Sequence, residues 1–69
     1  MSVIRDITEA EATSVMDAGV QLARIRLDKS MVTYVIKLDE SYFIVWCEGR
    51  DLWVVGGQEV DEKEILELV

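Results

Sequence analysis

Few side chains in this 69-residue sequence could carry out chemistry, and we find no catalytic motif among them. The chain has no histidine, so it lacks Ser-His and Cys-His arrangements and the usual general base at neutral pH. Its one cysteine, Cys47, ends a run of six apolar residues. That position indicates a small buried side chain rather than a nucleophile. We therefore expect a protein that is not an enzyme.

Metal and cofactor binding have equally little support. One cysteine and no histidine do not supply a zinc ligand set. Asp61, Glu62 and Glu64 lack the spacing of a calcium-binding EF-hand loop, and a helix cap explains Asp61 and Glu64. Gly56-Gly57 is not followed by the Lys-Ser/Thr of a phosphate-binding loop. We expect no metal and no cofactor.

The composition favours one small globular domain spanning residues 1–69, because 51% of the residues are hydrophobic and 30% are charged. The net charge is −7, from 14 acidic and 7 basic side chains. Such a charge suits a basic partner or imitation of a nucleic acid, although it is also compatible with a merely solvated acidic surface. No apolar stretch is long enough to span a membrane, and no signal-peptide layout is present, so we expect a cytoplasmic protein without a membrane partner.

Two helices are indicated by their caps. Thr8 and Glu11 form the S/T-x-x-E pattern of a capping box, which predicts a helix over Glu9–Ala18 that stops at Gly19. Asp61 is suited to cap a second, short helix, with Val60 and Ile65 as a hydrophobic staple. The expected apolar side of that helix consists of Ile65, Leu66 and Val69.

Between these helices we predict four strands. The central one is Tyr42-Phe43-Ile44-Val45-Trp46-Cys47, which is apolar on both faces. Residues 20–27 and 31–38 precede it, and residues 52–55 follow it. The pattern of residues 20–27 indicates either a bulge near Ala23 or that its first residues face something apolar. Residues 1–7 are interpreted as a lead-in. The expected fold is α+β, a four-stranded antiparallel meander in the order α-β-β-β-β-α.

Turn residues suggest the register of the sheet. We expect two-residue loops at Lys29-Ser30, Asp39-Glu40 and Gly49-Arg50. With these loops, the apolar residues at alternate positions of each strand would lie on the same face of the sheet, the core face. The opposite face, here called the mixed face, would combine cations with aromatic and apolar groups. Left in water, it would be an exposed apolar patch of the kind that marks interaction sites. Its candidate partner-binding residues are Arg24, Arg26, Tyr42, Ile44, Trp46, Trp53 and Val55.

The mixed face permits several functions. We expect a small acidic protein-binding module that forms a homodimer or docks on a host protein, as an inhibitor or adaptor does, including those encoded by phages. The alternative is a single-stranded nucleic-acid platform, in which bases stack on the aromatic residues and cations hold phosphates. Its cations would be Arg24, Arg26 and Lys37, and its aromatics Tyr42, Trp46 and Trp53. A third possibility is that one helix packs on each face and the mixed face is simply additional core.

Overall fold

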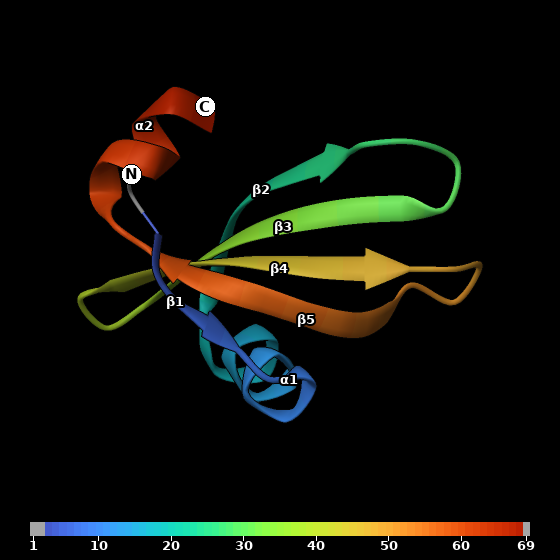
Figure 1. The fold of residues 1–69 in the computed structure, drawn as a ribbon, viewed down its shortest axis with the longest axis horizontal. Helices are drawn as coiled ribbons and strands as arrows, with labels where there is room; N and C mark the ends of the chain where they lie inside the picture. Colours follow the sequence, from blue (N-terminus) through green and yellow to red (C-terminus); the bar gives the residue numbers. More distant parts are fainter. Residues whose placement is uncertain (1–2, 69) are drawn as a thin grey trace.

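The computed structural model describes residues 3–68, which form one twisted antiparallel sheet with a helix on either side (Figure 1). Along the chain the elements are β1 (Val3–Ile7), α1 (Glu9–Ala18), β2 (Val20–Arg26), β3 (Met31–Leu38), β4 (Ser41–Glu48), β5 (Trp53–Val60) and α2 (Glu62–Leu68). The strand order is β1-β5-β4-β3-β2. The α+β class and the antiparallel meander are confirmed, but the sheet has five strands rather than four.

The additional strand is β1, which sequence analysis interpreted as a lead-in. It pairs with the second half of β5, so that Ile7 lies opposite Gly57. This pairing requires β5 to continue through Gly56-Gly57 to Val60, well beyond the predicted end at Val55. Gly57 allows it because a Cβ there would lie 2.4 Å from the carbonyl oxygen of Ile44. A glycine inside a strand often marks such a close backbone approach.

The helix ends are built as predicted, with one difference at each helix. The Thr8 hydroxyl accepts the Glu11 N–H at 3.1 Å, and α1 ends at Gly19. The Glu11 carboxylate, however, binds the Arg5 guanidinium at 2.7 Å. Asp61 Oδ1 accepts the backbone N–H groups that begin α2, while Leu66 is 69% exposed rather than part of its apolar side. Val69 lies outside the described residues.

Two hydrophobic clusters lie on opposite faces of the sheet. One packs α1 against the sheet through Ala12 and Val15 and includes Phe43, Val45 and Cys47. The other packs Ile65 of α2 against its facing strands, and its buried members are Val35, Ile44, Val60 and Ile65. Each helix therefore covers its own face, as the third possibility required. The described residues of α2 leave part of its face open.

The register of two hairpins differs from the prediction. Between β3 and β4, Val32 lies opposite Cys47 and Ile36 opposite Phe43, as predicted. Between β2 and β3, however, Ile25 lies opposite Thr33, because the loop has three residues, with Leu27 N–H donating to the Met31 carbonyl at 3.0 Å. A shift of one residue exchanges the faces of a strand.

The mixed face of the sequence analysis is the face on which α2 packs. The arginines of β2 are therefore on the α1 face and not on the mixed face. Arg24 lies opposite Tyr34, and its Nε is 3.4 Å from the Tyr34 hydroxyl. Arg26 lies opposite Val32, which is buried. Ala23 and Ile25 take the places of the arginines on the α2 face, where they pack against the second cluster.

The β4–β5 connection is also longer than the predicted two-residue loop. Glu48 lies opposite Trp53 rather than Asp51, which avoids the like-charge pairing that a two-residue loop imposes. Because this register shift is two residues, Trp53 keeps its predicted face. A bulge at Val55 then brings Gly56 opposite Trp46 and Gln58 opposite Ile44, so Val55 does not face Ile44 as predicted.

Three strands contain a bulge, and each bulged residue is a large apolar side chain that the sheet does not bury. The three residues are Ile4 in β1, Leu22 in β2 and Val55 in β5, at 59%, 46% and 40% exposure. A bulge near Ala23 was one of the two alternatives for β2, and the structure has it at Leu22. The other two bulges were not predicted. Both edge strands, β1 and β2, are therefore irregular, which is a common protection against edge-to-edge pairing.

Candidate protein-docking face

The open part of the α2 face contains a hollow that is mostly apolar. Its volume is ≈ 260 Å³. The side chains that line it are Ile25, Leu27, Thr33, Ile44, Trp46, Gln58 and Glu64. They come from β2 and the residue after it, β3, β4, β5 and α2, so the hollow exists only in the assembled sheet. We call these seven residues and Trp53 the open face.

The floor and the wall of the hollow differ in burial. Ile44 and Thr33 are buried at 7% and 6% exposure and form part of the sheet surface. Trp46 is half-buried and lies opposite Gly56, where a Cβ would be only 3.9 Å from the indole ring. The indole therefore rests on backbone. Leu27 remains 60% exposed at the rim.

Trp53 extends the apolar surface beyond the hollow. It is 59% exposed and follows Trp46 along the same face, opposite Glu48. Its ring lies on the β4–β5 loop, since a Cβ at Gly49 would be 3.1 Å from Trp53 Cζ2. The two tryptophans are thus held on glycine backbone, with one half-buried and the other largely in water. This arrangement is typical of aromatic anchors at protein interfaces.

The polar groups of the open face are few and acidic. Among the described residues lining the hollow, Glu64 is the one ionisable side chain, and exposed Glu48 lies beside Trp53. The ion pairs found within residues 3–68 join Arg5 to Glu11 and to Glu59, on the other side of the sheet. Gln58 donates to Asp6 at 3.2 Å. The open face therefore has an acidic margin without a cationic partner among the described residues.

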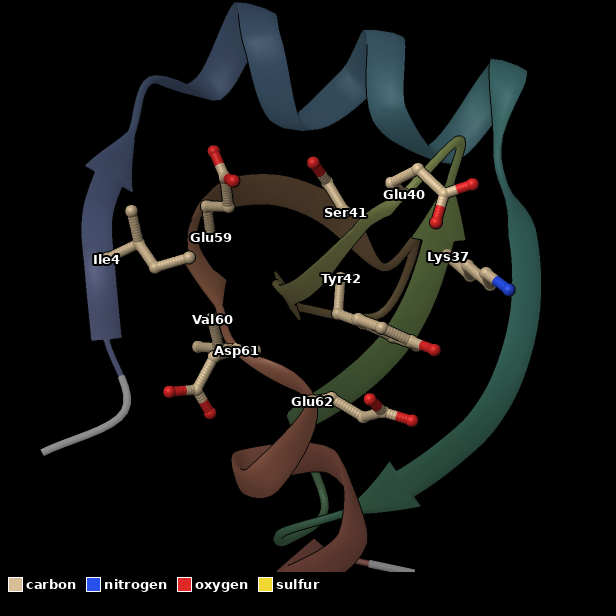
Figure 2. Close-up of a pocket in the computed structure, with 9 residues that line it drawn as sticks. All are labelled: Ile4, Lys37, Glu40, Ser41, Tyr42, Glu59, Val60, Asp61 and Glu62. Atoms are coloured by element: carbon tan, nitrogen blue, oxygen red, sulfur yellow. The ribbon is translucent and has the colours of Figure 1, made fainter.

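A second hollow, of ≈ 250 Å³, lies where the end of the sheet meets the start of α2 and has a more polar lining (Figure 2). Lys37 Nζ lies 5.7 Å from the centre of the Tyr42 ring, a cation–π contact. Glu59 is bound by Arg5, and Asp61 caps α2. These contacts within the chain explain most of the charged groups of this hollow, so it gives less reason to expect a ligand.

The predicted site residues are consequently divided among four places. Ile44 and Trp46 meet in the hollow, and Trp53 adjoins it. Tyr42 belongs to the polar hollow with Lys37, and Val55 is a bulge residue. Arg24 and Arg26 lie on the α1 face. The arrangement of Arg24, Arg26 and Lys37 beside three aromatics, which the nucleic-acid alternative requires, is not formed.

Sequence analysis missed Ile25, Leu27, Gln58 and Glu64 as members of this face. One signal for Ile25 and Leu27 was Asp28. Its carboxylate accepts the N–H groups of Ser30 and Met31 at 2.7 and 3.0 Å, an Asx turn that favours the three-residue loop. These hydrogen bonds, first that from Ser30, lower the pKa of Asp28. Gln58 is brought there by the bulge at Val55, for which we find no sequence signal. Glu64 is brought there by the packing of α2 on this face.

Cys47 is buried at 1% exposure in the α1-facing cluster, as predicted, and burial raises the pKa of its thiol. Neither described helix is long and apolar enough to cross a membrane. Within residues 3–68, no group of three or more cysteine, aspartate or glutamate side chains is placed to hold a metal ion. Comparison of the chain with protein-family models, with curated proteins and with solved structures gave no match.

Proposed function

We propose that this protein is a small, non-catalytic protein-binding module that docks a partner on its open face. The observation that carries the proposal is the apolar hollow beside α2, in whose wall Trp46 is half-buried. Two further apolar side chains of the open face, Leu27 and Trp53, are 60% and 59% exposed. Tryptophan anchors around a concave apolar site dominate the energetics of many protein interfaces. An inhibitor or adaptor acts in this way.

The other binding modes have less support. Pairing of edge strands is hindered by the bulges at Ile4 and Leu22. Stacking of two copies through their open faces would cover Glu48 and Glu64 of both copies, and no cation among the described residues lines the hollow of either copy. Homodimerisation therefore remains a prediction, to be checked by the mass of the protein in solution. The imitation of nucleic-acid charge by the −7 chain likewise remains a prediction.

The experiment compares three immobilised proteins for capture from a lysate of the source cells. These are the natural chain, the Leu27→Ser, Trp53→Ser double variant, and a control with Val20→Ser and Leu22→Ser. The control removes two apolar side chains of similar exposure, 65% and 46%, from the β2 edge instead of the open face. We expect mass spectrometry to identify a protein that the natural chain and the control retain and the open-face variant loses. If all three capture the same proteins, the proposal is wrong.

A further inference from the structure

The hollow of the open face also indicates what its occupant must look like; this step rests on the proposed function. At ≈ 260 Å³ the hollow is below the range of about 300–1,000 Å³ usual for small-molecule sites. It is open to solvent at the rim formed by Leu27, which is 60% exposed. Its apolar lining of Ile25, Ile44 and Trp46 therefore suits one large apolar side chain inserted from a partner's surface.

The charges around the hollow indicate which residues should flank that apolar side chain in the partner. Glu64 is half-buried in the lining and has no cationic partner among the described residues. Glu48 adds a second carboxylate next to Trp53. A partner that inserts an apolar group here also covers Glu64, and covering an unpaired carboxylate is costly unless a cation meets it. The net charge of −7 attracts a basic segment over longer distances.

We propose that the hollow binds a segment of a different protein in which one large apolar side chain is flanked by Lys or Arg, and that Glu64 pairs with that cation. A second copy of this chain fits less well, because its own open face presents carboxylates. A nucleic acid fits less well too, since the phosphate-binding candidates Arg24 and Arg26 lie on the other face of the sheet. In this arrangement the Glu64 carboxylate selects partners with a positive charge, and the hollow selects partners with a large apolar side chain beside it.

A random-peptide display library provides the probe. It is selected in parallel on the natural chain, on Glu64→Lys and on Glu67→Lys, which makes the same change of charge at an exposed position of α2 that does not line the hollow. We expect the natural chain and Glu67→Lys to enrich peptides with Lys or Arg near one large apolar residue. Glu64→Lys should lose this preference and enrich acidic peptides instead. Circular dichroism verifies that each variant is folded.

A synthetic copy of the most enriched peptide then gives the affinity by calorimetry. Glu64→Gln, which keeps the size of the side chain, should weaken binding about tenfold or more, as expected for one lost charge-assisted hydrogen bond. Selected peptides that lose binding on Leu27→Ser, Trp53→Ser but show no preference for Lys or Arg would overturn this inference and leave the proposed function intact. Peptides that bind that double variant as well as the natural chain, or no enrichment on the natural chain, would overturn both.

Discussion

Trp46 lies directly opposite Gly56, so the indole ring packs on backbone where β4 pairs with β5. No side chain from β5 covers it at this position, and the described residues of α2 cover it only in part. The ring is consequently half-buried and forms a wall of the hollow. A half-buried tryptophan contributes both to the stability of the fold and to the surface that a partner meets.

The two tryptophans should therefore differ in their effect on stability. Trp46→Ala should lower the free energy of unfolding by about 2 kcal/mol, somewhat less than the 3–5 kcal/mol typical of a fully buried aromatic. Trp53→Ala should lower it by less than about 1 kcal/mol, because the side chain is 59% exposed. Urea denaturation followed by circular dichroism measures both. Equal large losses would mean that Trp53 is core and not an anchor for a partner.

Replacing Gly57 by alanine should disrupt the sheet. The added Cβ would lie 2.4 Å from the Ile44 carbonyl oxygen and 3.2 Å from Val45 Cα, and neither backbone group can move without separating β4 from β5. We expect a loss of at least about 1–3 kcal/mol of stability, the usual cost of overpacking, measured by urea denaturation. Ala10→Gly, on the exposed side of α1, is a control for an ordinary glycine–alanine difference. A stable Gly57→Ala protein would contradict the β4–β5 register.

The Asx turn at Asp28 should make a small, pH-dependent contribution to stability. Its pKa is lower in the folded protein because the ionised carboxylate accepts the Ser30 and Met31 N–H groups. The stabilisation is therefore present above the unfolded pKa of about 4 and is lost as the pH falls through the lower folded value. Asp28→Asn should lose less stability than the natural chain between pH 6 and pH 2 in urea denaturation. Asp51→Asn, in the exposed β4–β5 loop, provides the control; an identical loss in all three proteins would exclude this role for Asp28.

The thiol of Cys47 should be unreactive while the protein is folded. It is 1% exposed, and burial raises its pKa, so little thiolate forms near neutral pH. We expect a thiol reagent such as 5,5′-dithiobis(2-nitrobenzoic acid) to label it at pH 8 only as fast as the chain opens, and rapidly in concentrated urea. Rapid labelling of the folded chain would contradict the placement of Cys47 in the α1-facing cluster.

Local chemistry was sufficient to predict the elements whose signals lie within a few residues. The caps at Thr8 and Asp61, the stop at Gly19 and the alternation of β3 and β4 were correctly read because each depends on neighbours in the sequence. The short loop at Asp39 fixed the β3–β4 register for the same reason: Leu38 lies opposite Ser41. The burial of Cys47 followed from its place on the core face of β4.

The open face depended on interactions that the sequence does not reveal locally. One additional residue in the β2–β3 loop was enough to move Arg24 and Arg26 to the α1 face and to bring Ile25 beside Trp46, because side chains alternate along a strand. β1 becomes a strand only by pairing with residues of β5 that lie fifty or more positions later in the sequence. The sequence by itself determined the two helices and the location of four of the five strands, and it indicated that one sheet face would be difficult to cover. Which side chains surround the uncovered part was decided by loop lengths, by bulges and by the position of α2. The β2–β3 loop had a local signal in Asp28, whereas the bulges and the packing of α2 depend on contacts between distant segments.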